Sequence, residues 1–343
     1  MTMTLVADHP GTVRVRRQTP SGVIALALFT VAVVALIAMP WWAKTGTIRM
    51  VLELCCYIAV AQMWNMLAGY AGLVSVGQQA FMGAAGYALF VLAQTFGINP
   101  FLAIFLSLLV PLVLAVPCYL LLHRLDGPYF AIGTWVVAEV FRLTATNLGF
   151  IGAGSGMSLS VMRDYSGFER NVAMSLLCAF MILATIGGSY LFLRSRYGLA
   201  LIAIRDNPVA AASQGIDVAR LRFGIYIAAA VGCGLAGAVY SMAQLRINPA
   251  SAFDPNWSNI AIFIVMVGGI ASIEGVLIGA LIYFLADRWF GEYGASYFVV
   301  LGMMTVIVAL YARGGIWGAF SKRYDAPWFP IRRHLVQSSE HRS

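Results

Sequence analysis

The sequence RSRYGLALIAIRDNPVAAASQGIDVARLR, residues 194–222, is a long polar interruption between two hydrophobic segments, and it carries a helix signal of its own. Asp206 and Asn207 offer side-chain oxygens to unpaired backbone N–H groups, and Pro208 suits a first helical position. An alanine-rich run propagates the helix, and Gly215 ends it because glycine adopts the left-handed conformation without a Cβ penalty. The stretch predicts a helix of roughly 10 Å, flanked by Arg194, Arg196, Arg205, Arg220 and Arg222.

The composition of the chain indicates a membrane protein. Of its 343 residues, 61% are hydrophobic and only 10% are charged, which is more apolar surface than one soluble core could bury. The formal charge of +8 comes from basic residues in loops and at the ends. That pattern favours contact with membrane lipid and argues against nucleic acid as a partner. The cysteines lie in apolar stretches and predict neither disulfides nor a metal site: Cys55, Cys56, Cys118, Cys178 and Cys233.

Hydrophobic segments alternate with polar loops in a way that predicts an all-α polytopic membrane protein with about ten transmembrane helices. The first segment is long and lacks a small-residue cleavage site, so we expect a retained span and not a signal peptide. The eighth and ninth spans are barely separated, so either could be short, broken or re-entrant. The predicted spans are 22–39, 50–68, 76–96, 101–122, 129–148, 172–193, 222–243, 258–273, 275–290 and 296–312.

The distribution of Lys and Arg predicts which side each loop faces. Basic residues just before the first span assign residues 1–20 to the cytoplasm by the positive-inside rule. Ten crossings within a transmembrane domain over residues 21–313 then return the basic tail 314–343 to the cytoplasm, so both termini share one side. Most Lys and Arg residues, including those of the 194–222 loop, also fall there. The longer outer loops, 149–170 and 244–257, are the expected docking surface for something arriving from outside.

The chain has no sequence motif for nucleotide or metal chemistry. A phosphate-binding loop needs GxxxxGK[ST], and the only lysines, Lys44 and Lys322, stand in other contexts. The histidines lie at or beyond span ends and show no HExxH spacing. We therefore expect no catalytic residues, no metal ligands and no cofactor in this chain, and we do not expect an enzyme.

Polar residues within spans are costly, so each needs a reason. Glu139 lies about 15 Å deep in its span, and Arg142 follows three positions later on the same helix face. They could form an internal ion pair that holds two helices together, or Glu139 could line a polar route. Gln62 and Asn65 could likewise bond a neighbouring helix or face a pathway.

A glycine-rich segment, GYAGLVSVGQQAFMGAAGYALF (69–90), has polar residues among its glycines. Small residues let helices approach closely, which alone could explain Gly83 and Gly86. A helix break near 72–79 that exposes backbone groups to a cavity is the alternative, and it is typical of a transporter. In that case Ser75, Gln78 and Gln79 join Asn65, Glu139 and Arg142 as candidates for a translocation pathway.

A family resemblance rests on five segments in order along the chain. They are NMLAGYAGLVSVGQQAFMGAAGYA (65–88), LDGPYFAIGTWVVAEVFRLTATN (125–147), RYGLALIAIRDNPVAAASQGIDVARLRFGIYIAAAVGCGLAGAVY (196–240), IVMVGGIASIEGVLIGA (264–280) and LYARGGIWG (310–318). Together they resemble the permease subunits of bacterial branched-chain amino-acid ABC importers of the Liv type, the LivM-like subunit in particular. The third segment is the most specific, because its order of basic loop, capped helix, glycine and glycine-rich span recurs in that family.

The resemblance implies an inner-membrane importer subunit that pairs with a second homologous permease. It also implies two cytoplasmic ATPase subunits, which would hold ATP and Mg²⁺, and a periplasmic substrate-binding protein. Residues 205–216 match the coupling helix of such permeases, although Pro208 stands where many members have an acidic residue. The implied coupling residues are Arg205, Asp206, Asn207, Pro208, Ala210, Ala211 and Gly215.

Two alternatives to a branched-chain amino-acid permease stay open on the sequence. Importers of urea and short-chain amides share the same permease architecture, so the family does not fix the substrate. A secondary transporter or channel that does not use ATP is a different class. It should show more acidic or histidine relays inside its spans than Glu139 alone provides.

Overall fold

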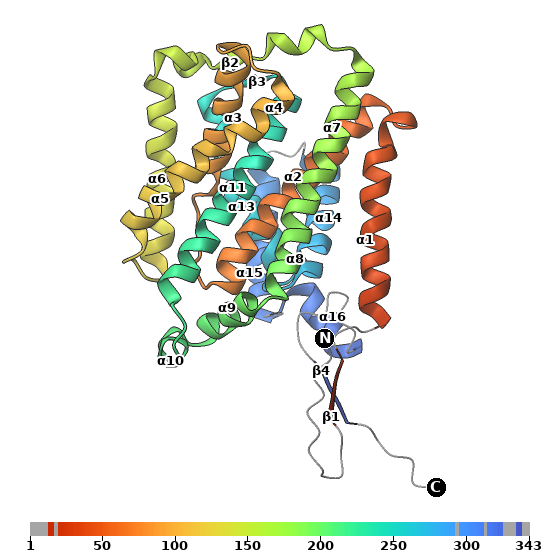
Figure 1. Ribbon diagram of the computed structural model, residues 1–343, viewed down its shortest axis with the longest axis vertical. Coiled ribbons are helices and arrows are strands. Elements are labelled where there is room, and N and C mark those ends of the chain that lie inside the picture. The colour runs from red at the N-terminus through yellow and green to blue at the C-terminus, as the bar shows by residue number, and fades with distance from the viewer. Residues whose placement is uncertain (1–12, 17–19, 292–294, 312–313, 325–333, 338–343) are drawn as a thin grey trace.

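The structure is a computed structural model that describes residues 13–16, 20–291, 295–311, 314–324 and 334–337, and helices make up most of it (Figure 1). Most of the predicted segment 1–20 and half of the predicted tail 314–343 lie outside the described residues. The first helices are α1 (Pro20–Ala38), α2 (Thr45–Asn65), α3 (Gln78–Gln94), α4 (Pro100–Ser107), α5 (Leu109–Leu122), α6 (Pro128–Asn147), α7 (Gly167–Ile182) and α8 (Gly188–Leu193). The remaining helices are α9 (Arg196–Asp206), α10 (Pro208–Ser213), α11 (Val218–Gln244), α12 (Pro249–Ala252), α13 (Asn256–Gly268), α14 (Ile273–Phe290), α15 (Ala295–Tyr311) and α16 (Gly315–Tyr324).

Several of these helices can cross a bilayer. Within the part of the chain that the structure describes, five helical segments are long and apolar enough to span it: Gly22–Trp41, Thr45–Tyr70, Pro100–Leu122, Gly167–Leu193 and Val218–Gln244. Two bent pairs bring the number to seven if each is one span, namely α6 with the short turns that follow it and α12–α13 with α14. Each of the ten predicted spans overlaps a helix, which confirms a helical, multi-pass protein. The predicted number of ten crossings stays a prediction.

Irregular turns interrupt the helices, both within the crossing segments and between them. The last turn of the α2 segment is a π-helix, η2 (Met66–Tyr70), and a second π-helix, η6 (Leu183–Gly187), joins α7 to α8. Residues 71–77 between η2 and α3 are not helical, and Gly72 there has φ +71°. The α12–α13 and α14 segments meet at 117°. Such breaks leave backbone groups that other parts of the chain must satisfy.

The core is built around α2 and the α3–α11 pair. Almost every residue of α2 from Cys55 to Asn65 is buried, because α7, α11, α13 and α14 pack around it. The glycines of α3 and α11 allow close contact, since a Cβ at Gly237 would meet Met82 and a Cβ at Gly83 would meet Phe253. The close-packing interpretation is therefore confirmed for Gly83. The predicted break near 72–79 is also present, because residues 71–77 are not helical.

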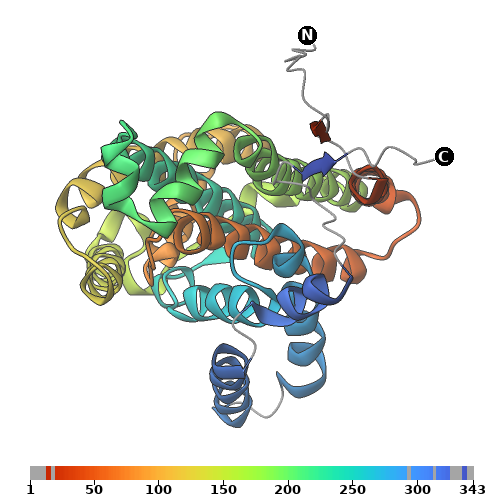
Figure 2. The ribbon, with the colours of Figure 1, turned by 90° about the horizontal axis from the view of Figure 1, so that it is seen from below.

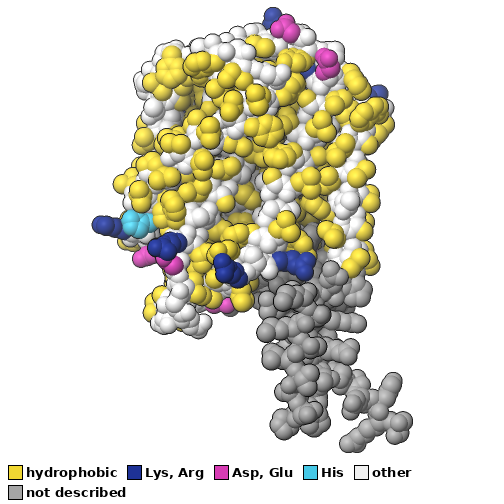
Figure 3. Space-filling view, viewed as in Figure 1, with side chains coloured by type: hydrophobic (Ala, Val, Ile, Leu, Met, Phe, Trp, Pro, Cys, Tyr) yellow, Lys and Arg dark blue, Asp and Glu magenta, His cyan; other side chains and the backbone are white. Residues whose placement is uncertain are grey.

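The two ends of the bundle carry different small elements. At one end lie α9, α10 and the antiparallel pair of β1 (Val13–Arg16) with β4 (His334–Gln337), in which Val13 faces Gln337 (Figure 1). At the other end, β2 (Met157–Ser158) pairs with β3 (Arg246–Ile247), so the two predicted outer loops meet. Figure 2 shows α15 at the margin of the bundle, beside α13. Hydrophobic side chains cover the face between the ends, and the charged ones gather at the ends (Figure 3).

Candidate functional site

The 194–222 stretch folds into two helices, α9 and α10, and α10 is the helix predicted from the sequence. Asn207 Oδ1 accepts hydrogen bonds from the backbone N–H groups of Val209 and Ala210, both at 3.0 Å, and Pro208 opens the helix. Gly215 has φ +81° and closes it, with its N–H donating to Ala212 O at 2.9 Å. The predicted cap at Asn207 and the predicted stop at Gly215 are confirmed.

The predicted capping role of Asp206 is wrong, and α9 was not predicted. The Asp206 carboxylate caps nothing in α10, because it accepts from the Arg205 guanidinium at 3.1 and 3.2 Å. Helix α9 is capped by Ser195, whose side chain accepts a hydrogen bond from Tyr197 N, and it buries Leu201 and Ile204. Ser195 was the available signal for this helix. The basic residues in and around this segment made its apolar helix face difficult to recognise in the sequence.

The exposed surface of α10 is apolar at its tip. The Val209 side chain is 77% exposed, whereas Ala211 on the opposite side is 2% exposed and packs against the rest of the chain. An exposed valine on a short capped helix at one end of the molecule (Figure 1) is a surface that another protein could cover.

Two arginines connect this region to the end of the α2 segment. Arg205 Nη1 donates to Gly69 O at 3.3 Å, and Arg222 Nε donates to Ala71 O at 3.3 Å. The last carbonyls of a helix lack intrahelical partners and carry partial negative charge, so guanidinium donors are well suited to them. The α9–α10–α11 region is thereby tied to the start of the non-helical 71–77 segment.

A buried polar cluster surrounds the segment 71–77. Trp64 Nε1 donates to Ser75 O at 2.7 Å, and Val76 N donates to Thr134 Oγ1 of α6 at 2.9 Å. Gln78 N donates to Ser258 Oγ of α13 at 3.2 Å, and the Ser258 hydroxyl in turn donates to the Gln79 side chain. The structure therefore brings Ser75, Gln78 and Gln79 together between α3, α6 and α13.

Two buried amide side chains near this cluster lack partners. Among the described residues, neither Gln62 nor Gln78 finds a hydrogen-bond partner for its side-chain oxygen or nitrogen, although both are fully buried. Unsatisfied buried amides are costly, so they mark positions where water or a polar solute would be stabilised.

Asn65 braces the break between α13 and α14. Its Oδ1 accepts from Ala271 N at 2.8 Å, and its Nδ2 donates to Ser272 O at 3.1 Å. Ala271 has φ +58°, a left-handed conformation that is unfavourable for a residue with a Cβ. Of the two interpretations of Asn65, the bond to a neighbouring helix is the one observed.

Glu139 and Arg142 form an ion pair, but it lies within one helix. Arg142 Nε donates to Glu139 Oε2 at 2.9 Å, three residues apart on α6. The expectation that the pair holds two helices together is therefore wrong. The two side chains are 40% and 31% exposed on the outer face of α6, among the apolar side chains of Trp135, Val136 and Leu143.

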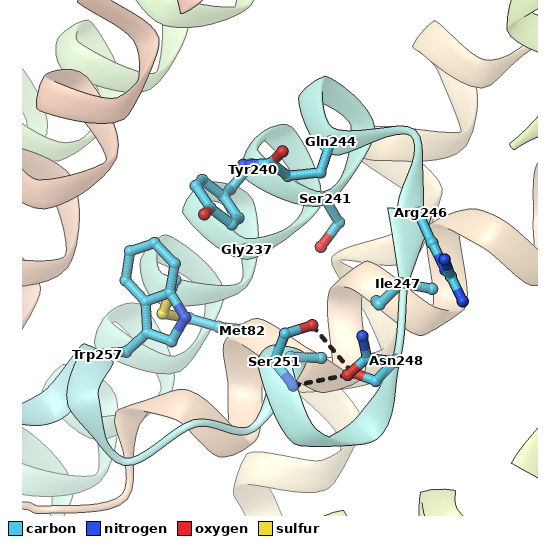
Figure 4. A pocket seen from close by; sticks show the side chains of 11 residues that line it. Met82, Gly237, Tyr240, Ser241, Gln244, Arg246, Ile247, Asn248, Ser251 and Trp257 are labelled. Atoms are coloured by element: carbon cyan, nitrogen blue, oxygen red, sulfur yellow. Dashed lines mark hydrogen bonds between the residues drawn. The ribbon is translucent and has the colours of Figure 1, made fainter. Parts of the chain in front are cut away.

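A pocket of about 360 Å³ opens at the β2–β3 end, where the 244–257 loop turns back between α3 and α11. Its polar lining includes Ser241, Gln244 and Arg246 (Figure 4). Ser251 N donates to Asn248 Oδ1 at 2.9 Å and fixes the loop. The 244–257 loop was predicted to be an outer surface, but the pocket was not predicted, because its walls come from segments that are distant in the sequence. Within the described part of the chain, no group of three or more His, Cys, Asp or Glu side chains could hold a metal ion.

Comparison with known proteins gives the class of this membrane protein. The profile of the family described as "Branched-chain amino acid transport system / permease component" matches residues 46–310. The chain is therefore a multi-pass permease subunit of an ABC importer in the inner membrane. It belongs to the branched-chain amino-acid transport permease family.

Individual relatives are distant but cover most of the chain. It is 23% identical over 319 residues to the high-affinity branched-chain amino acid transport system permease protein LivM of Escherichia coli K12, covering 84% of this chain and 74% of LivM. It is 28% identical over 267 residues to the "Probable branched-chain amino acid transport permease protein LivH" of Methanocaldococcus jannaschii, covering 70% of this chain and 82% of LivH. A shorter match, 28% identical over 125 residues, links it to the fructose import permease protein FrcC of Rhizobium meliloti, covering 34% of this chain and 35% of FrcC.

Proposed function

We propose that this permease subunit moves branched-chain or chemically related amino acids into the cell, driven by ATP hydrolysis in two separate cytoplasmic subunits that grip residues 205–216. The observation that supports this most is the pair of arginine-to-carbonyl bonds, from Arg205 to Gly69 and from Arg222 to Ala71. They join α9 and α11, the helices on either side of the exposed α10, to the broken segment in the interior. Movement of α10 can therefore be transmitted into the membrane domain through these two hydrogen bonds.

The proposed orientation has the α10 end in the cytoplasm. The charge distribution supports it, since the 194–222 loop is the most basic long loop of the chain. With ten crossings, residues 1–20 and 314–343 flank a transmembrane domain of residues 21–313 on the cytoplasmic side. The pairing of β1 with β4 at the α10 end fits an even number of crossings.

The coupling step follows from the contacts of α9 and α10. The two helices pack against each other, and α9 also contacts η2. When the ATPase subunits close around ATP and Mg²⁺, they would move α10 through its exposed Val209 side and the residues around it. Arg205 would carry that movement to Gly69 and change the position of the segment that holds Ser75 and Gln78.

The proposed pathway runs past the polar cluster between α3, α6 and α13. Hydroxyl and amide groups of Ser75, Gln78 and Gln79 can take over part of a solute's hydration without holding it by charge. That suits a step in which the solute must also leave. Asn65 would set the position of the α13–α14 break instead of contacting solute.

The Glu139–Arg142 pair is expected to face a second permease across a shared route. An ion pair exposed to hydrocarbon is expensive, whereas a polar route between two subunits can solvate it. One acid and one base side by side are complementary to the ammonium and carboxylate groups of an amino acid. Urea, which carries no charge, would not use such a pair. This favours amino acids over amides as the solute.

The partners in this proposal are a second homologous permease, two ATPase subunits and a periplasmic substrate-binding protein. The 149–170 and 244–257 loops, joined by β2 and β3, would form the docking surface for the binding protein. The 360 Å³ pocket lies beneath the second loop.

Purification and reconstitution test the proposal. The full chain should co-elute with ATPase subunits in fixed ratio, and the complex in liposomes should take up leucine only with ATP and a binding protein. Uptake by the purified chain alone would refute ATP coupling. Transport of urea but not leucine by the complete complex would refute the substrate while leaving the coupling intact.

A further inference from the structure

A second cavity, larger than the pocket at the β2–β3 end, lies along α11 and has no part in the proposed transport. It measures about 660 Å³ and is lined mainly by apolar side chains of α7–α8 on one side and α11 on its floor. In Figure 1, α11 runs between α4–α5 and α7–α8. The residues that line the cavity come mainly from α11 and from α7–α8, with Met63 of α2 and Met66 of η2. A cavity of this size falls within the range of ligand sites, roughly 300–1,000 Å³.

Small residues form the walls of this groove. Gly224, Ala228 and Gly232 recur every four residues on one face of α11, and Gly188 lies opposite on α8. A Cβ placed on Gly188 or Gly224 would meet no atom within 4 Å. These two glycines therefore serve no close helix contact within this chain, and the space beside them is open.

The groove has the length and polarity of one membrane leaflet. From Arg220 to Leu235 it follows α11 for about 22 Å, whereas half of a bilayer's hydrocarbon core is about 15 Å thick. The additional length, at the α10 end, is where Arg220 and Tyr197 line the mouth. Arg196 stands over the Tyr197 ring, with its guanidinium carbon 5.0 Å from the ring centre.

The charge at the mouth is positive. The Arg220 side chain is 89% exposed and forms an ion pair with Asp217, with Nε 3.0 Å from Oδ2. Arg196, beside Tyr197, adds a second guanidinium at the mouth. Two cations with one carboxylate attract a phosphate group, as polybasic sites at membrane surfaces do.

A buried hydroxyl inside the groove is the second sign of a ligand. Ser189 is 5% exposed, and its Oγ has no hydrogen-bond partner among the described residues. It lies about 8 Å along the helix from Arg194. That depth corresponds to the inner edge of the headgroup layer, which is about 5–8 Å thick on each side. An ester carbonyl of a lipid would reach this hydroxyl there.

We propose that the groove along α11 is a binding site for one anionic phospholipid. One acyl chain lies over Gly224 and Gly188, the phosphate meets Arg220 at the mouth, and an ester oxygen accepts a hydrogen bond from Ser189. The lipid occupies the space between α7–α8 and α11 and can be exchanged with the surrounding bilayer. This assignment does not depend on which solute the permease carries.

Bound lipid can be counted directly. The full chain in its purified complex is equilibrated with vesicles of equal parts dioleoyl phosphatidylglycerol and dioleoyl phosphatidylcholine. Mild detergent then releases it for native mass spectrometry. We expect one lipid per chain with phosphatidylglycerol preferred about five-fold, since one surface arginine contributes about that factor. A wild-type chain that retains no lipid, or retains both lipids equally, overturns the assignment without any variant.

Two variants and a matched control locate the site. Gly188→Leu with Gly224→Leu places two side chains in the groove at positions where the added Cβ atoms meet no protein atom within 4 Å. Loss of as few as two methylene contacts reduces lipid binding about ten-fold. Arg220→Gln should keep the lipid and abolish the preference for phosphatidylglycerol. Gly46→Leu, at an equally open helical glycine outside the groove, should change nothing. The site is refuted if the monodisperse double variant retains as much lipid as the wild type. It is also refuted if Gly46→Leu loses lipid to the same degree as the double variant.

Discussion

Replacing Asn207 with alanine should uncouple ATP hydrolysis from transport while leaving the membrane domain folded. The Asn207 side chain accepts two of the first N–H groups of α10, both at 3.0 Å. Loss of an asparagine cap costs about 1 kcal/mol, with a range of about 0.5–2. Helix α10 has only six residues, and isolated helices shorter than about 12 residues are marginal in water. The cap is therefore a large part of what keeps α10 folded at the surface.

The expected size follows from that free energy. About 1 kcal/mol changes the ratio of folded to frayed α10 roughly five-fold. Substrate-stimulated ATP hydrolysis and uptake by the reconstituted complex should both fall by about two- to five-fold. Basal ATP hydrolysis by the ATPase subunits should be unchanged, because their nucleotide sites lie outside this chain. Asn207→Asp should restore coupling, since aspartate caps as well as asparagine.

A matched control separates coupling from general stability. Asn99 precedes Pro100 at the start of α4, and its Oδ1 accepts from Phe101 N at 2.9 Å. This is the same capping chemistry on an exposed residue away from α10. Asn99→Ala should cost similar stability and leave stimulated hydrolysis intact. The reasoning fails if Asn207→Ala couples normally, or if Asn99→Ala loses coupling to the same degree.

Three further predictions concern other parts of the chain. Gly215→Ala should weaken coupling in the same assay, because φ +81° costs a residue with a Cβ about 1–2 kcal/mol; normal coupling would show that the end of α10 does not matter. Asn65→Ala should lower the free energy of unfolding by about 1–3 kcal/mol, since the N–H of Ala271 loses its acceptor; an unchanged melting temperature in detergent would contradict this. The charge swap Glu139→Arg with Arg142→Glu should keep subunit assembly but not restore uptake to the level of wild type, because a solute on the route meets the charges in reversed order. Full restoration would identify a purely structural pair.

Local signals were sufficient to predict α10. Its cap, its proline, its alanines and its terminal glycine lie within ten residues, and each acts on the backbone next to it. The multi-pass helical architecture was equally accessible, because a span is apolar along its whole length. The Asp206 error also has a local cause. Two adjacent side chains, Asp206 and Asn207, could have accepted the hydrogen bonds that cap α10. Asn207 does so, and Asp206 pairs with its neighbour Arg205 instead.

Contacts between distant segments were beyond the sequence. Arg205 and Gly69 are 136 positions apart, and Asn65 and Ala271 are 206 apart. Nothing in the local pattern selects those partners. Helix α9 was missed for a related reason, since its amphipathic face is defined by burial of Leu201 and Ile204 among other helices. The surroundings of Glu139 were likewise unpredictable. The helical repeat places Glu139 and Arg142 on one face of α6, but it does not determine which part of the chain, if any, packs against that face.

The exposed face of α6 supports the proposed pairing of this chain with a second permease. Its polar cluster reaches α6 through the bond from Val76 N to Thr134, and the Glu139–Arg142 pair lies farther along the same helix, turned outward. In a lone chain, that pair would face hydrocarbon at a cost of several kcal/mol. A second permease against α6 removes the cost by enclosing a polar space between two such helices. Glu139 and Arg142, whose position is unfavourable in a single chain, would then line the polar space between the two proposed permease subunits.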